Sequence, residues 1–291
     1  MRILDSHLHL WDPTVLTYAW LEGRLLRRFG PEDYREAVTG AVDAADARAA
    51  VFVQAECAPE HSLAEVDLAG AAAPEAGIVG IVARAGVERG DAVAGELDIL
   101  ADRPLVVGVR RLIQDEAPGF ARSDAFVAGA GHVARRGLTF DACVRWHQLD
   151  EVIDLAARVP DLRIVVDHLG KPPLGTRPRD AEGRAVWERT LRRLATHPHV
   201  HCKLSGLPAE SHPDTTVATW EAVFDVALDA FGPGRLLFGG DWPVSWPYHA
   251  WEAAVREWAE SRVPDDAPAI LAANAERFYG VSISAAPTGG C

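Results

Sequence analysis

The chain has 291 residues, which suits either one large α/β barrel, typically about 250 residues, or two ordinary domains. Its hydrophobic fraction of 48% supports a buried core, and its formal net charge of −13 argues against a nucleic-acid-binding surface. No apolar run approaches the roughly 20 residues that cross a bilayer, and the first four residues lead into a polar motif in place of a signal-peptide core. We therefore expect a cytoplasmic protein that binds neither nucleic acid nor membrane.

Short apolar runs rich in β-branched residues recur along the chain and predict eight strands. They are Ile3–Asp5, Ala50–Gln54, Ile78–Ala83, Leu105–Leu112, Leu138–Cys143, Arg163–Asp167, Val200–Leu204 and Arg235–Phe238. The stretches between them carry helical apolar spacing, for example residues 63–73, 150–158, 187–195 and 220–231. This alternation predicts an α/β fold consisting of a single (β/α)8 TIM barrel.

The ends of the chain set the expected domain bounds. We expect the barrel to span residues 1–281, because no interior linker stands out as a boundary. Residues 282–291 are small, polar and Gly-rich, which predicts a flexible C-terminal tail. The connection from Trp11 to about Gly30 is longer than usual and rich in aromatic residues. It is either a lid over the barrel mouth or a packed surface loop.

The four cysteines are widely scattered and lack the close spacing of a zinc ribbon or a redox pair. We expect them to be reduced thiols without a catalytic role. They are Cys57, Cys143, Cys202 and Cys291.

The first strand leads into two histidines, His7 and His9, two positions apart. On a strand, such residues point to the same face, so both imidazoles can converge on one substrate or one metal ion. The alternative is a pair of half-exposed histidines at a strand end. A second polar turn far along the chain, residues 238–243, carries Asp241.

Functional side chains of a TIM barrel lie at the C-terminal ends of its strands. The polar residues at these ends are His7, His9, Gln54, Glu56, Arg110, Arg111, Asp167, His168, Lys203, Ser205 and Asp241. Each has a plainer alternative: His168 as a hydrogen-bonded core residue, Lys203 in a buried ion pair, and Asp241 as a turn residue. Because adjacent residues of a strand face opposite ways, we expect only one of Arg110 and Arg111 to point into the mouth.

The motifs at these strand ends resemble the sugar-lactonase-like branch of the amidohydrolase superfamily, which includes fuconolactone, rhamnonolactone and muconolactone-type hydrolases. The matching segments occur in order over nearly the whole chain. They are residues 5–13, 53–55, 108–116, 167–172, 202–207 and 238–244.

The resemblance implies roles for individual residues. His7 and His9 match the first-strand pair of the superfamily, His168 its sixth-strand histidine and Asp241 its catalytic aspartate. The fifth strand offers no histidine, and the fourth offers no lysine for carboxylation, so we expect no two-metal site. The resemblance leaves two alternatives, no cofactor or one divalent metal, zinc or manganese, bound by these three histidines and Asp241.

Other departures from the branch concern the substrate. Sugar lactonases often carry an aspartate after the third strand, where this chain has Arg84, and a histidine where it has Arg111. Extra arginine would suit an anionic, carboxylated lactone, although Arg84 is equally compatible with a surface position. We expect substrate contacts from Arg110, Gln54, Lys203 and Trp242. The sequence does not identify the lactone, its ring size or the oligomeric state.

We predict a hydrolase that opens a lactone ring by attack of water on the carbonyl. Asp241 removes the proton from water and returns it to the departing alkoxide, and His7, His9, His168 and Arg110 are candidates to stabilise the carbonyl oxygen. The alternative enzyme is a metal-dependent, non-oxidative decarboxylase of an aromatic or muconate-type acid. A third possibility is a barrel that binds a sugar acid without turnover.

Overall fold

The computed structural model describes residues 1–39, 47–175 and 177–283. Within them, eight parallel strands form one sheet in sequential order, which confirms the predicted (β/α)8 barrel. The strands are β1 (Arg2–Leu8), β2 (Ala47–Val53), β3 (Ile78–Arg84), β4 (Val106–Arg110), β5 (Thr139–Ala142), β6 (Ile164–Val166), β7 (Val200–Leu204) and β8 (Leu236–Phe238).

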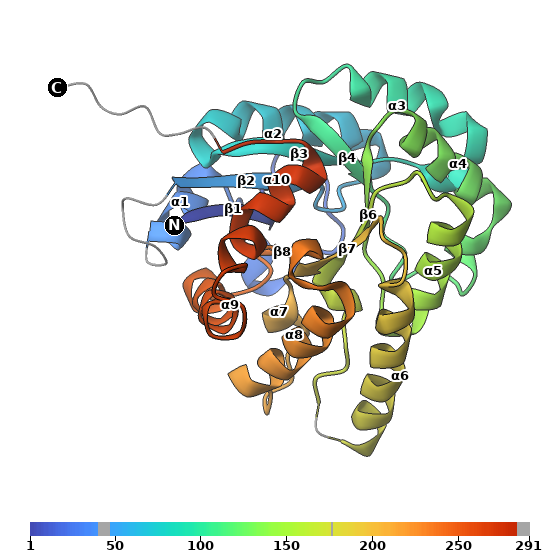
Figure 1. Cartoon of the computed structure of the whole chain (residues 1–291). Coiled ribbons are helices and arrows are strands. Elements are labelled where there is room, and N and C mark those ends of the chain that lie inside the picture. The colour runs from blue at the N-terminus through green and yellow to red at the C-terminus, as the bar shows by residue number, and fades with distance from the viewer. Residues whose placement is uncertain (40–46, 176, 284–291) are drawn as a thin grey trace.

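Helices surround the strands, as Figure 1 shows. They are α1 (Pro31–Thr39), α2 (Ser62–Ala76), α3 (Ala94–Ala101), α4 (Asp124–Arg135), α5 (Leu149–Arg158), α6 (Pro178–Leu194), α7 (Leu207–Glu210), α8 (Val217–Phe231), α9 (Tyr248–Arg262) and α10 (Asn274–Tyr279). Among the described residues, no helix combines the length and the apolar character that crossing a bilayer requires.

The strands separate two parts of the apolar core because successive side chains point to opposite faces. On β2, Val51 and Val53 belong to the cluster inside the barrel, whereas Ala50 and Phe52 belong to the cluster between the strands and the outer helices. Phe278 of α10 packs in the inner cluster. Helix α10 therefore covers one end of the barrel and leaves the other end for the polar strand ends.

The barrel closes between β1 and β8 through contacts that involve site residues. Asp5 Oδ1 accepts hydrogen bonds from the backbone N–H of His7 at 3.0 Å and of Gly240 at 2.7 Å. The N–H of Asp241 donates to the carbonyl of His7 at 2.7 Å. The seam that completes the barrel thus also fixes His7 relative to Asp241.

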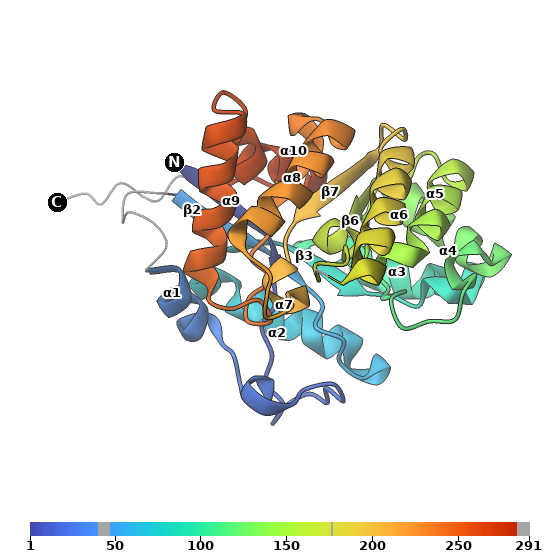
Figure 2. The same ribbon diagram turned by 90° about the horizontal axis from the view of Figure 1, so that it is seen from below.

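The long first connection follows β1 and extends past α1 and α2 at the lower edge of Figure 2. Trp20 in this loop donates its indole N–H to the carbonyl of Ala55 at 2.7 Å. Arg24 donates to the carbonyls of Pro243 and Val244 at 2.8 and 2.5 Å, in the loop after β8. The loop therefore bridges the connections after β2 and β8.

Most of the predicted tail, from residue 284 onward, lies outside the described residues. Ile283 is buried and its N–H donates to Glu276 at 2.9 Å. The division between barrel and tail stays a prediction. Cys57, Cys143 and Cys202 are buried free thiols, and Cys291 lies outside the described residues.

Candidate active site

A cavity of about 220 Å³ lies at the C-terminal ends of the strands. Its volume is small beside the roughly 300–1,000 Å³ of pockets for drug-sized ligands, so it suits a small molecule. Polar side chains predominate among those that line it: His9, Glu56, Arg110, Gln114, Asp115, His168, Lys171, Glu210 and Asp241, together with Trp20 and Cys143.

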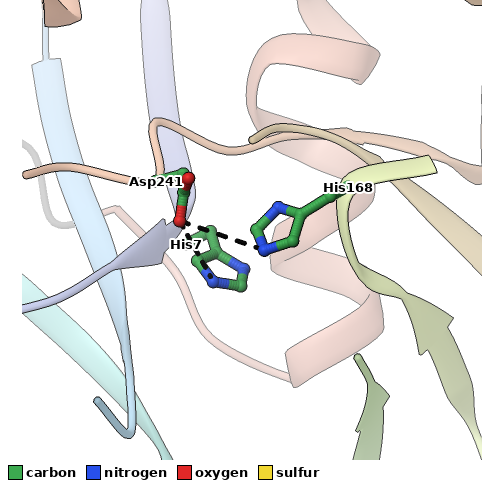
Figure 3. Close-up of side chains that lie close together, drawn as sticks. All are labelled: His7, His168 and Asp241. Carbon is green, nitrogen blue, oxygen red and sulfur yellow. Dashed lines mark ion pairs between the residues drawn. The ribbon is translucent and has the colours of Figure 1, made fainter. Parts of the chain in front are cut away.

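The carboxylate of Asp241 lies at the centre of three imidazoles. Its Oδ1 is 3.5 Å from Nε2 of His9, 3.8 Å from Nε2 of His7 and 3.9 Å from Nε2 of His168. Figure 3 shows the contacts to His7 and His168. The other oxygen, Oδ2, accepts a hydrogen bond from Ser245 Oγ at 2.7 Å. One carboxylate oxygen is thus anchored and the other faces the imidazoles.

Left-handed backbone conformations aim two of these side chains. Asp241 has φ +53° and His168 has φ +54°, values that non-glycine residues seldom adopt. Gly206 allows His168 to take its place, because a Cβ on Gly206 would lie 2.2 Å from Nδ1 of the ring. His168 Nδ1 also contacts Ser205 Oγ at 2.9 Å. The strained backbone conformations at Asp241 and His168 therefore position their two side chains in the site.

Beneath the cavity, His7 belongs to a buried network of charges. Lys203 Nζ lies 2.5 Å from Asp141 Oδ2, 3.0 Å from Asp167 Oδ1 and 3.1 Å from His7 Nδ1. Arg110 Nη1 lies 3.2 Å from Asp167 Oδ2 and 3.2 Å from His7 Nε2. Two cations and two carboxylates therefore form a buried network around one imidazole.

Burial keeps the imidazoles of His7 and His168 neutral. Desolvation lowers the pKa of His168 to about 4, against the opposing effect of Asp241. Desolvation and the nearby Lys203 hold the pKa of His7 well below its ordinary value, although Asp167 opposes the shift. At neutral pH both rings are therefore uncharged.

The carboxylates of Asp241 and Asp167 keep their charge despite burial, because neighbouring groups lower their pKa values. Desolvation alone would raise the pKa of Asp241, but interactions with His168, His9 and His7 lower it below its ordinary value. The pKa of Asp167 is likewise lowered, because Lys203 and His7 outweigh burial. Both groups are therefore ionised at neutral pH.

The structure places the expected site residues in two layers. His9, Arg110, His168 and Asp241 line the cavity. The remaining expected residues, His7, Gln54, Lys203 and Trp242, are buried outside its lining.

Lys203 and Trp242 have partners away from the cavity. Lys203 forms the ion pair that the sequence left open as its alternative role, and Trp242 packs against Phe29 and Tyr34. Strand position alone could not separate the two layers, because it does not give the depth of a side chain.

Arg110 and Arg111 diverge, as side chains of adjacent strand residues do. Arg110 lines the cavity, whereas Arg111 binds Glu88 and Glu116. Arg84 also does not line the cavity. The two arginines that raised the prospect of an anionic substrate therefore lie elsewhere.

Sequence reasoning missed Lys171, whose ammonium reaches the cavity wall. Its Nζ donates to Gln114 Oε1 at 2.6 Å and binds Glu210 Oε1 at 2.9 Å. An ammonium has three N–H donors, so one is left for a ligand. The signal in the sequence was the segment 168–172, where Lys171 follows His168 within the family motif.

The donor set fits one divalent metal ion. Ligand atoms of His7, His168 and Asp241 lie within 4.8 Å of one another. Zinc bonds of about 2.0 Å place neighbouring ligand atoms about 3.3 Å apart, close to the separations around Asp241. Nδ1 of His9 donates to the carbonyl of Val53 at 2.7 Å, which leaves Nε2, 3.5 Å from Asp241 Oδ1, as the ring nitrogen available to a metal ion.

The fold and this centre of imidazoles and one carboxylate define a barrel built for hydrolytic or metal-assisted chemistry. Residues 4–281 match the amidohydrolase family, and the chain belongs to that family.

A curated relative from Burkholderia ambifaria, named L-fucono-1,5-lactonase, is 32% identical over 290 residues that cover 96% of this chain and 95% of that protein. A crystal structure of an amidohydrolase from Burkholderia multivorans with bound zinc is 30% identical, has a TM-score of 0.84, and covers 97% of this chain and 100% of that chain. A 5-carboxyvanillate decarboxylase from Sphingomonas paucimobilis, 13% identical with a TM-score of 0.66 over 97% of this chain and 99% of that chain, shares the fold alone.

Proposed function

We propose that the protein hydrolyses a small, uncharged sugar lactone, with Asp241 as the general base. The observation that carries the proposal is the ionised Asp241 carboxylate held among three imidazoles at the wall of a small cavity. The similarity to the fuconolactonase supports this substrate class.

The charges of the cavity favour a neutral substrate over a carboxylated one. Its two cations already face carboxylates: Arg110 binds Asp167 at 3.2 Å and Lys171 binds Glu210 at 2.9 Å. Further carboxylates on the wall would repel an anion. Carboxylate oxygens and the free N–H of Lys171 instead suit the hydroxyl groups of a sugar.

The reaction begins when Asp241 Oδ1 accepts a proton from water while the water oxygen attacks the lactone carbonyl. The ring C–O bond then breaks, and protonated Asp241 returns the proton to the alkoxide that leaves. The lowered pKa of Asp241 keeps the base ionised, although it also weakens the base. A lactone, as an activated ester, tolerates a weaker base than an amide would.

Arg110 is our candidate for stabilising the negative charge on the carbonyl oxygen. The Nε atom of this buried side chain has no hydrogen-bond partner among the described residues. A buried donor without a partner is costly, so a ligand that accepts this hydrogen bond gains free energy. Because the guanidinium of Arg110 is already in place, it can stabilise the developing charge without reorganisation during the reaction.

A bound divalent metal, held by His9, His168 and Asp241, would supply Lewis-acid polarisation of the carbonyl. Zinc and manganese both remain candidates for this position. The steps above use only side chains of the chain itself.

The test is a panel of lactones monitored by proton release with a pH indicator. We expect turnover of neutral sugar lactones and at least about tenfold lower kcat/KM for carboxylated lactones of the same ring size. Turnover of none of them would refute the proposal. Carbon dioxide release from aromatic acids that is abolished by chelation would instead favour the decarboxylase alternative.

A further inference from the structure

We propose that Arg110 and Lys203 act as built-in competitors of a metal ion at His7, so that the site binds zinc weakly and without His7 as a ligand. This inference concerns metal affinity and does not depend on which lactone is hydrolysed. It rests on the contacts of the two ring nitrogens of His7.

Each ring nitrogen of His7 lies within hydrogen-bond distance of a cation that can only donate. Arg110 Nη1 is 3.2 Å from Nε2, and Lys203 Nζ is 3.1 Å from Nδ1. A neutral imidazole has one acceptor nitrogen and one N–H. The ring can therefore accept a hydrogen bond from only one of the two cations at a time.

Both arrangements block Nε2, the nitrogen that faces Asp241. If Nε2 accepts from Arg110, its lone pair is occupied, and Nδ1 carries the hydrogen, 3.3 Å from the carboxylate oxygen Oδ1 of Asp167. If Nδ1 accepts from Lys203, Nε2 carries the hydrogen. A metal ligand needs a free lone pair, so zinc can use His7 only by displacing one of these contacts.

The surrounding charges add to this competition. Lys203 and Arg110 balance the carboxylates of Asp141 and Asp167, to which they are paired. The layer beneath the site thus contributes no excess negative charge to attract a dication. Asp241 is left as the carboxylate available to the metal, with His9 and His168 as the imidazole ligands.

The experiment measures zinc affinity of the purified, metal-stripped full chain by competition with a chromophoric chelator. Arg110→Met removes the donor and the charge but keeps a long unbranched side chain. Its matched control is Arg111→Met, which removes a charge from the adjacent residue, whose partners are Glu88 and Glu116. We expect Arg110→Met to tighten zinc binding by at least about tenfold, since removing the Arg110 donor frees the lone pair of His7 Nε2 and adds a ligand to the site.

The role of His7 is tested separately, which keeps the proposal decidable if Arg110→Met does not fold. In the wild-type background, His7→Asn should change the zinc Kd by less than about threefold, because His7 is not a free ligand. In the Arg110→Met background, the same substitution should abolish the gain in affinity.

Three results would overturn the proposal. One is a gain for Arg110→Met no larger than that for Arg111→Met. Another is a loss of tenfold or more on His7→Asn in the wild-type background. The third is a gain that persists without His7, which would assign the effect to charge at long range.

Discussion

Gly206→Ala offers a sharp test of the position of His168. The new Cβ would lie 2.2 Å from Nδ1 and 2.4 Å from Cγ of the ring, whereas ordinary contacts are about 3.4 Å or longer. The imidazole must therefore move by about 1 Å, which breaks its 2.9 Å contact with Ser205 Oγ. A displacement of this size in an active site costs about 100-fold in rate.

The same substitution also strains the backbone, since Gly206 has φ +72°. This strain costs about 1–2 kcal/mol in any residue with a Cβ. Gly280→Ala is the matched control, because Gly280 has φ +71° and a Cβ there would meet nothing within 4 Å. Both variants should lose this backbone term in urea unfolding, and Gly206→Ala should lose more because of its contact with His168, but only Gly206→Ala should lose activity.

The assay is kcat/KM for the best neutral lactone, measured at a temperature where both variants are folded. We expect a fall of about 100-fold for Gly206→Ala and a change of less than about twofold for Gly280→Ala. Equal activity of the two variants would refute the placement of His168 at the reacting centre.

Three further substitutions test other parts of the structure. Burial raises the pKa of Glu65 to about 7, so its contribution to stability is full below pH 4.5 and is lost as the pH rises through 7. Glu65→Gln should remove that dependence. Between pH 4.5 and pH 8, the free energy of unfolding of the variant should rise by roughly 3 kcal/mol relative to that of the wild type. Parallel pH profiles of the two proteins would contradict this prediction. Lys203→Met leaves Asp141 and Asp167 without their shared cation, and we expect the free energy of unfolding in urea to fall by about 3–5 kcal/mol. A loss below about 1 kcal/mol would show that the ion pairs of Lys203 are not buried as described. Lys171→Met should raise KM for a sugar lactone by about tenfold with kcat nearly unchanged, because it removes a donor to substrate hydroxyls; an unchanged KM would exclude that contact.

The fold was predictable from the sequence because the buried strands of a parallel barrel are apolar on both faces and stand out as short runs. The ends of the strands were less predictable. Arg163–Asp167 was expected as a strand, but β6 ends at Val166, since Asp167 and His168 enter a turn in which His168 has a positive φ. Apolar patterning carries no signal for such a turn.

The site was predictable where its residues follow strands and not where loops supply them. His9, Arg110, His168 and Asp241 could be found from strand order and motif. Lys171 follows β6 and Glu210 ends α7, so the two meet only when the barrel is folded and no periodicity links them. Contacts of this kind depend on the whole barrel.

The most direct test of the central claim is Asp241→Asn. Asparagine has the shape of aspartate, tolerates the positive φ at this position and can still accept the hydrogen bond from Ser245, but it cannot take a proton from water. With a neutral sugar lactone as substrate, we expect kcat/KM to fall by about 10²- to 10⁴-fold while the thermal unfolding profile shows a folded protein. A folded Asp241→Asn protein that retains activity within tenfold of wild type would contradict the assignment of Asp241 as the general base.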